Sequence, residues 1–226
     1  MRTRLLGRGD GPLVMLLHGF GAPGDDLVSL AGALRLPPSA RFAFPEAPID
    51  LGFGRAWWMI DTGRFERALS RPGGLAEIAA ERPEGLEKAR DGVLELVDSL
   101  AAEHGLSSDR FVLGGFSQGA MLSLEVALAL AGRSPPARPA GLVLWSGTVI
   151  AETHWRSLAA DRRLQGLPVV LAHGRQDPLL PYGQAEVLRE LLASAGALVT
   201  WVPFDGGHTI PVEAIEATRA LVARLL

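Results

Sequence analysis

The chain of 226 residues contains no cysteine. This absence excludes a disulfide framework, a thiol nucleophile and thiolate metal ligands, and it is compatible with a reducing cytoplasm. A basic stripe is also missing, because 22 lysine and arginine residues stand against 25 acidic residues and the net charge is −3. Nucleic acid is therefore a poor partner. We expect a cytoplasmic protein that does not bind nucleic acid.

Long hydrophobic runs are absent too. No stretch approaches the ~20 apolar residues of a transmembrane helix, so we expect no integral membrane segment. The first sustained apolar run, residues 13–17, is too short for the core of a signal peptide. Hydrophobic residues nevertheless make up 48% of the chain and charged residues 21%, which is enough for a sizeable core. No linker divides the chain, and we expect one domain over residues 1–226.

Apolar runs alternate with helical patterns along the whole chain. The expected strands are residues 13–17, 41–44, 111–114, 141–145, 168–172 and 198–204. The expected helices are residues 25–34, 84–104, 121–131, 154–164, 182–195 and 212–225. Several of the strands are continuously apolar, which is typical of strands buried on both faces of a parallel sheet. We therefore predict an α/β fold with a mostly parallel sheet, helices on both faces, and chemistry at the carboxyl ends of the strands.

Residues 115–119, Gly-Phe-Ser-Gln-Gly, lie between a predicted strand and a predicted helix. A sharp turn at this place strains the backbone of Ser117 and raises its hydroxyl clear of the sheet. The flanking Gly115 and Gly119 are small, as such a bend requires. The pattern predicts that Ser117 is a nucleophile, and the alternative is a tight strand–helix turn without chemistry.

A serine hydroxyl is a weak nucleophile at neutral pH and needs a base, which histidine can supply. In serine hydrolases built on this kind of sheet, the chain order is serine, acid, histidine. His208 follows the last predicted strand in a loop with two glycines, so we predict that it is the base rather than a structural loop histidine. Asp177, just past strand 168–172, is the predicted acid. Asp205, three residues before His208, is its rival.

The negative oxygen of a tetrahedral intermediate needs N–H donors. We predict the backbone N–H groups of Gln118, next to the nucleophile, and of Phe20, in the loop after the first buried strand. Gly19 and Gly21 flank Phe20 and permit a close approach, although a plain glycine turn is the alternative. We expect His18 to brace this loop rather than to bind a metal. No metal and no cofactor are expected.

Residues 45 to about 82 form the least regular part of the sequence. A long irregular segment inside a compact domain is usually functional or mobile, and we interpret this one as a wall or partial lid of a substrate site. Trp57, Trp58 and Trp145 are the predicted substrate-binding residues. The alternative is a surface excursion anchored by its aromatic side chains. Tryptophans that look exposed also suggest a homodimer.

With these residues assembled, the chain resembles the carboxylesterase/phospholipase family of α/β hydrolases, which includes acyl-protein thioesterases and small bacterial esterases. The resemblance covers nearly the full length, and its motifs are highly specific when taken together. They are residues 17–21 (Leu-His-Gly-Phe-Gly), 44–48 (Phe-Pro-Glu-Ala-Pro), 57–61 (Trp-Trp-Met-Ile-Asp), 115–120 (Gly-Phe-Ser-Gln-Gly-Ala), 145–147 (Trp-Ser-Gly), 173–178 (His-Gly-Arg-Gln-Asp-Pro) and 206–208 (Gly-Gly-His).

The resemblance implies an α/β-hydrolase fold and a catalytic triad of Ser117, Asp177 and His208. It implies metal-free hydrolysis of a small-molecule carboxylic ester, or of a thioester or lysophospholipid, through an acyl-enzyme. Trp145 and residues 64–82 depart from the family pattern and favour a small bacterial-type esterase over an enzyme for lipidated proteins. Acyl transfer to an alcohol or amine by the same triad, and ligand binding without catalysis, stay open as alternatives.

Overall fold

A computed structural model describes residues 1–105 and 110–225 of the chain. Its centre is a seven-stranded sheet with the strand order β1-β3-β2-β6-β7-β8-β9. The strands are β1 (Thr3–Leu6), β2 (Leu13–Leu17), β3 (Arg41–Pro45), β6 (Phe111–Phe116), β7 (Gly141–Trp145), β8 (Pro168–Gly174) and β9 (Leu198–Phe204). The short strands β4 (Ile49–Asp50) and β5 (Arg55–Ala56) pair with each other in a separate ribbon.

The sheet is parallel except at one edge. Strand β1 runs antiparallel to β3, and all the other pairs within the sheet are parallel. The predicted α/β fold with a mostly parallel sheet is therefore confirmed. The sequence analysis does not predict β1, because this edge strand is partly exposed along its length and shows no continuous apolar run.

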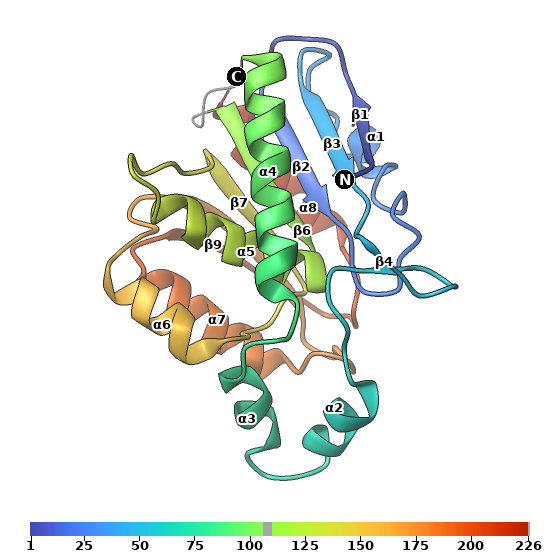
Figure 1. Ribbon diagram of the computed structural model, residues 1–226, viewed down its shortest axis with the longest axis vertical. Helices are drawn as coiled ribbons and strands as arrows, with labels where there is room; N and C mark the ends of the chain where they lie inside the picture. Colours follow the sequence, from blue (N-terminus) through green and yellow to red (C-terminus); the bar gives the residue numbers. More distant parts are fainter. Residues whose placement is uncertain (106–109, 226) are drawn as a thin grey trace.

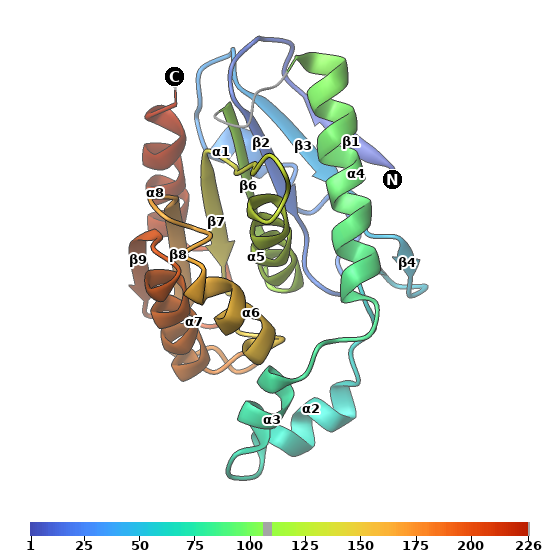
Figure 2. The ribbon, with the colours of Figure 1, turned by 60° about the vertical axis from the view of Figure 1, so that its left-hand side comes forward.

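Helices cover both faces of the sheet, as Figures 1 and 2 show. They are α1 (Leu30–Ala33), α2 (Thr62–Leu69), α3 (Gly74–Ala80), α4 (Leu86–His104), α5 (Gln118–Ala131), α6 (Glu152–Ala160), α7 (Tyr182–Ser194) and α8 (Val212–Ala223). One core cluster joins the sheet to α4, α5, α6 and α7, and a second joins it to α1 and α8. The helix expected at 25–34 is shorter than predicted, because turns occupy residues before α1.

No helix within residues 1–105 and 110–225 is both long enough and apolar enough to cross a bilayer. Helix α5 is the most apolar of the long helices, and its central position explains this composition. Most of its residues are buried because it lies against the sheet while α4 packs along its outer side. A helix that is apolar all round is expected at such a place in the core of a protein.

Residues 45–82 are more regular than the sequence predicts. The structure forms α2 and α3 within this segment, and we call residues 62–80 the helical hairpin. Asp61 caps α2, because its carboxylate accepts the Arg64 N–H at 2.8 Å. Gly73 begins α3 with a φ of 76°, which glycine adopts readily. Both helices are short and contain glycine, and two turns of helix are too few for a pattern to stand out among the glycines and prolines of this segment. Figure 1 shows the hairpin projecting from the rest of the molecule.

Candidate active site

Ser117 sits at the turn between β6 and α5. Its φ of 54° and ψ of −117° are strained for a residue with a side chain, as expected for a nucleophile at a sharp strand–helix turn. The flanking glycines have a steric cause. A Cβ atom on Gly119 would lie 2.0 Å from the Leu17 carbonyl oxygen, and one on Gly115 would lie 2.6 Å from the Gly119 carbonyl carbon. No other residue type fits at either position without a shift of the backbone.

The loops after β8 and β9 bring Asp177 and His208 together. The His208 Nδ1 atom lies 2.7 Å from the Asp177 Oδ2 atom. The other carboxylate oxygen accepts the N–H groups of Leu179 and Leu180, each at 2.9 Å. Burial alone would raise the pKa of Asp177, but the hydrogen bonds from His208 and from the two amides outweigh it and lower the pKa. The carboxylate is therefore ionised and fully occupied by donors.

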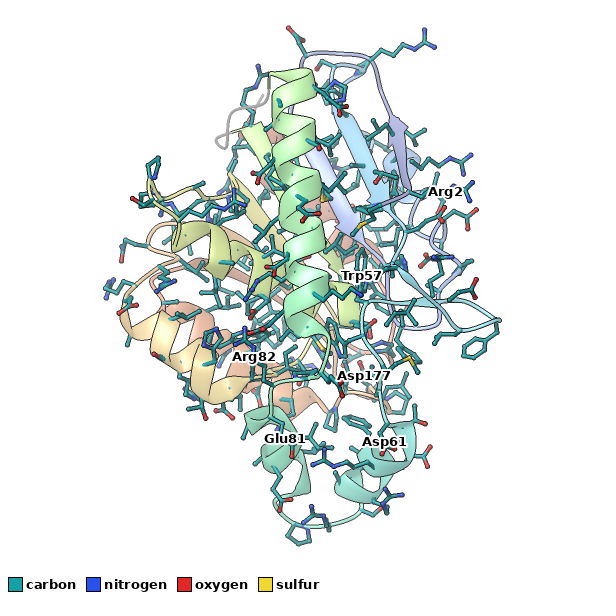
Figure 3. The ribbon with its side chains drawn as sticks, in the orientation of Figure 1. Arg2, Trp57, Asp61, Glu81, Arg82 and Asp177 are labelled. Carbon is teal, nitrogen blue, oxygen red and sulfur yellow. The ribbon has the colours of Figure 1, made fainter. Side chains whose placement is uncertain are left out.

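The rival acid, Asp205, lies elsewhere. Its carboxylate is exposed and faces the Arg175 guanidinium at 3.6 Å. The His208 ring nitrogen is bonded to Asp177 instead. Of the two aspartates that sequence reasoning weighed, only Asp177 contacts the histidine. Figure 3 shows Asp177 on the side of the molecule that faces the helical hairpin, where Asp61 and Glu81 are labelled.

The loops after β8 and β9 can approach each other closely because glycine residues lie where they touch. A Cβ atom on Gly174 would lie 2.3 Å from the Gly207 carbonyl oxygen. The Gln176 N–H donates to the Gly206 carbonyl at 3.0 Å, which ties the loops together. The turn after β7 joins them, since the Ser146 hydroxyl donates to the Thr209 carbonyl at 3.1 Å. The backbone that carries the histidine is thus held by the ends of two neighbouring strands.

His208 also lies beside the serine turn. Its ring packs against Phe116, the residue before Ser117, with 4.7 Å between ring centroids. No hydrogen bond joins the Ser117 hydroxyl to the His208 ring among the side chains that the structure describes. Such bonds are often long in enzymes without substrate and tighten when a substrate is bound. The structure therefore brings the three predicted residues to one edge of the sheet, and among them it forms the hydrogen bond between Asp177 and His208.

The loop after β2 lies directly over the nucleophile. A Cβ atom on Gly19 would be 3.4 Å from the Ser117 Cβ atom. Within residues 1–105 and 110–225, the N–H groups of Phe20 and Gln118 have no backbone carbonyl as partner in a turn or loop. Gln118 is also the first residue of α5, where the free amides and the helix dipole favour negative charge. These two amides are suited to receive an oxyanion.

His18 braces this loop, as its position in the sequence predicts. Its Nε2 accepts the Ala47 N–H at 3.0 Å, so that its Nδ1 carries the proton and donates to the Gly19 carbonyl at 2.8 Å. Burial is the largest influence on the ring and lowers the pKa of His18. The Trp57 indole N–H donates to the His18 carbonyl at 2.9 Å. A neutral histidine thus fixes the loop at both ring nitrogens.

The side chain of Gln118 has a role that sequence reasoning missed. Its Oε1 atom accepts the Trp57 N–H at 3.0 Å, and its Nε2 atom donates to the Trp58 carbonyl at 2.9 Å. The amide is 1% exposed and both of its ends are satisfied. Gln118 therefore ties the 57–58 segment to the residue after the nucleophile. The signal in the sequence is a polar glutamine at the start of a segment that is otherwise mostly apolar.

The three tryptophans predicted to bind substrate are buried. Trp57, Trp58 and Trp145 are 1%, 3% and 0% exposed. Trp145 packs in the core cluster beneath α1 and α8, on the other side of the sheet from α5. Direct contact with a substrate would need a rearrangement of the core, so the burial of these side chains does not support their prediction as substrate-binding residues. The homodimer prediction, which rested on exposed tryptophans, loses its basis.

Other apolar side chains are exposed near the site. The Phe53 side chain is 77% exposed and lies over Gly21, where a Cβ atom would be 3.4 Å from the phenyl ring. Met59 follows the buried tryptophans, and Leu179 belongs to the acid loop; they are 60% and 55% exposed. An apolar surface at the mouth of a site favours an apolar ligand. Unlike the three tryptophans, these residues have side-chain surface that a ligand could contact.

Comparison with known proteins gives a consistent result. The sequence pattern of the Phospholipase/Carboxylesterase family matches residues 8–225. Acyl-protein thioesterase 1 of Gibberella zeae is 26% identical over 94% of this chain and 90% of its own length. The crystal structure of esterase PE8 superposes with a TM-score of 0.79 at 30% identity and covers 99% of this chain and 98% of that one. The crystal structure of a carboxylesterase from Mesorhizobium loti shares the fold, with a TM-score of 0.75 at 22% identity over 98% and 93% of the two chains.

Proposed function

The chain belongs to the phospholipase/carboxylesterase family of hydrolases, and from this premise we propose that it cleaves carboxylic esters through an acyl-enzyme on Ser117. The observation that carries the proposal is the 2.7 Å hydrogen bond between His208 Nδ1 and Asp177. An ionised carboxylate accepts only, so that Nδ1 carries the proton. The other ring nitrogen, Nε2, is then left with a lone pair and can take a proton from the serine.

Acylation follows from this arrangement. The Ser117 oxygen bonds to the ester carbonyl carbon while its proton moves to His208 Nε2. The carbonyl oxygen becomes an oxyanion and accepts the N–H groups of Phe20 and Gln118. Asp177 stabilises the imidazolium that has formed. The carbon–oxygen bond to the alcohol then breaks, and the imidazolium returns its proton to the leaving alkoxide.

Deacylation repeats these steps with water. His208 takes a proton from the water, the hydroxide oxygen bonds to the acyl carbon, and the oxyanion again lies at the two amides. The bond to Ser117 breaks and the serine recovers its proton. The sheet edge contributes preorganisation, because strained backbone at Ser117 and the braced loop of Phe20 are formed before the substrate arrives.

The apolar approach supports an ester with an apolar acyl group. Phe53, Met59 and Leu179 provide exposed apolar surface. A thioester is a second candidate, because the curated relatives of this chain include acyl-protein thioesterases and the same steps cleave a carbon–sulfur bond. A panel of esters and thioesters with matched acyl chains distinguishes the two.

Substitution of Ser117 tests the proposal. We expect Ser117→Ala to lower kcat for p-nitrophenyl butyrate by at least about 10³-fold and to abolish labelling by a fluorophosphonate probe. The matched control is Ser123→Ala, a buried serine of α5 whose hydroxyl donates to the Gly119 carbonyl. Its kcat should stay within twofold. Undiminished turnover by Ser117→Ala, with an unchanged melting temperature, would refute the assignment.

A further inference from the structure

A second histidine lies against the acid. His173 stands near the end of β8, and its side chain is completely buried. Its Nε2 atom is 2.7 Å from the Leu180 carbonyl oxygen and 3.3 Å from Asp177 Oδ2, the oxygen that also receives His208. Neither of these oxygens carries a proton to give, so Nε2 is the protonated nitrogen of His173. One N–H therefore faces a carbonyl and the carboxylate together.

His173 closes a ring of hydrogen bonds around the acid loop. The Leu180 N–H donates to Asp177 Oδ1 at 2.9 Å, and the Leu180 carbonyl accepts from His173. His173 itself is fixed by the register of the sheet, in which it pairs with Pro203 of β9. The turn from Asp177 to Leu180 is thus attached to the sheet through the buried imidazole of His173. Without the His173 imidazole, the Leu180 carbonyl loses its donor and the Asp177 carboxylate loses a neighbouring N–H group.

The charge state of His173 suits this position. The groups that face its ring are Asp177, His208, the Leu180 carbonyl, the Gly147 backbone and Tyr182 of α7, whose ring centroid is 6.3 Å away. Burial is the largest influence and lowers the pKa of His173, despite the nearby carboxylate. A neutral ring donates a hydrogen bond without neutralising Asp177. The negative charge of the carboxylate stays available to His208.

We propose that His173 is a positioning residue, which holds the Asp177 carboxylate in the direction that stabilises a charged His208 during catalysis. This inference rests on the proposed function, because it concerns the same acid and base. It assigns no chemistry to His173, whose ring is sealed from the substrate. Within residues 1–105 and 110–225 no three histidine and acidic side chains are arranged to hold a metal ion, so a donor role is the one that the geometry supports.

Three substitutions separate positioning from simple packing. His173→Gln places an amide N–H about where Nε2 lies, His173→Asn carries the same amide on a shorter side chain, and His173→Leu removes the donor but retains apolar bulk. Each is assayed for kcat and KM with p-nitrophenyl butyrate from pH 5 to 9, well below its melting temperature. Thr218→Val on α8, a buried residue whose hydroxyl bonds the Ala214 carbonyl at 2.8 Å, is the matched control for loss of a buried hydrogen bond away from the site.

We expect His173→Leu to lower kcat by about 10- to 100-fold with KM within threefold, since misdirection of a catalytic group affects the transition state most. The acidic limb of its kcat–pH profile should move to lower pH, because a misplaced carboxylate stabilises charged His208 less well. His173→Gln should recover most of kcat and the original limb, and His173→Asn should not. Thr218→Val should leave both unchanged.

A His173→Leu variant that keeps kcat within twofold and an unmoved acidic limb would overturn the inference, even if it melts at a lower temperature. Equal losses in the Gln, Asn and Leu variants would do the same, since they would indicate packing alone. If His173→Leu does not fold, the comparison of the Gln and Asn variants decides the matter. Ser117→Ala serves as the separate check: full activity in that variant refutes the proposed function, whereas failure of the His173 series alone refutes only the positioning role.

Discussion

Two regions of the molecule are built in opposite ways. The loops that carry the proposed acid and base, residues 174–181 and 205–211 (the catalytic loops), emerge from adjacent strands and are joined by hydrogen bonds and glycine contacts. The helical hairpin, residues 62–80, is bounded by exposed ion pairs, Arg64 with Glu81 and Arg71 with Glu77. Exposed pairs contribute little to stability, whereas buried hydrogen bonds are costly to break. The comparison indicates that specific hydrogen bonds fix the loops that carry Asp177 and His208, whereas the ion pairs of the hairpin contribute little to its attachment.

Among the substitutions that test this comparison, Asp177→Asn should have the largest effect, a loss of kcat. The Leu179 and Leu180 amides require an acceptor, so the new amide oxygen will face them and its NH₂ group will face His208. His208 Nδ1 then becomes the acceptor, and Nε2 takes the proton and cannot act as a base. We expect kcat to fall by about 10³- to 10⁴-fold. Asp205→Asn, in the exposed rival, is the control and should stay within twofold; similar losses in both variants would contradict the assignment.

The attachment of the hairpin segment to the core should show a smaller effect, on stability. Glu125 of α5 is 2% exposed and accepts from Arg82 at 3.0 Å, Arg90 at 3.3 Å and the Trp155 indole at 2.7 Å. Arg82 directly follows the hairpin segment, and Figure 3 labels it beside Glu81. Glu125→Ala leaves these donors without their acceptor.

We expect Glu125→Ala to lower the free energy of unfolding by about 3 kcal/mol, measured by urea denaturation at pH 7.5. Its kcat should stay within fivefold, because no catalytic loop is attached to Glu125. Glu152→Ala, which removes a partly exposed pair with Arg156 on α6, is the control. A loss of stability no larger than that of the control would show that the buried cluster is not what attaches the hairpin to the core.

Gln118→Ala sharpens the comparison at the point where the 57–58 segment meets the nucleophile. The variant keeps the backbone N–H that receives the oxyanion but leaves the Trp57 N–H and the Trp58 carbonyl unpaired in the interior. We expect kcat to fall by about tenfold to thirtyfold through displacement of the Phe20 loop, with little change in KM. Steady-state kinetics at 25 °C measure this. An unchanged kcat would mean that the bridge is only structural.

The pH dependence of stability should also originate in the buried region. His18 and His173 both have a lowered pKa, with burial as the largest cause, whereas an unfolded chain has histidines with a pKa of about 6.5. Below that pH the unfolded state binds more protons than the folded state, so the free energy of unfolding falls as the pH falls. Asp177, whose pKa is lowered, adds a further loss below about pH 4.

Melting temperatures at pH 7.5, 6.5 and 5.5 measure the histidine part of this effect. We expect a decrease from pH 6.5 to 5.5, and a smaller decrease in His173→Gln, which has no titrating group at this site. His104→Gln, at the exposed end of α4, is the control and should follow the unsubstituted protein. An equal decrease in the two variants would contradict the assignment to buried rings.

The smallest effect belongs to the hairpin. Arg64→Ala removes the pair with Glu81, and both side chains are half exposed. We expect the melting temperature to change by less than about two degrees, and kcat for a short ester to stay within twofold. A decrease comparable to that of Glu125→Ala would break the comparison, because the exposed pairs would then be holding the hairpin.

Some of this molecule could be read directly from its sequence. Strand β9 lies where its apolar run predicts, and α4 begins within two residues of its predicted start. The turn at Ser117 follows from glycine spacing. These features depend on neighbouring residues, so a linear pattern records them. The hairpin does not follow from the sequence analysis, because its two helices are only eight and seven residues long.

The sequence by itself determined the alternation of strands and helices, the place of Ser117, and which loops carry Asp177 and His208. The tertiary structure decided which acid contacts the base, that the tryptophans lie in the core, and that His173 and Gln118 connect parts of the site. These contacts join residues that are distant in the chain or turn inward from different elements. Burial and direction of a side chain arise only when the sheet and its helices are packed together, and no local pattern encodes them.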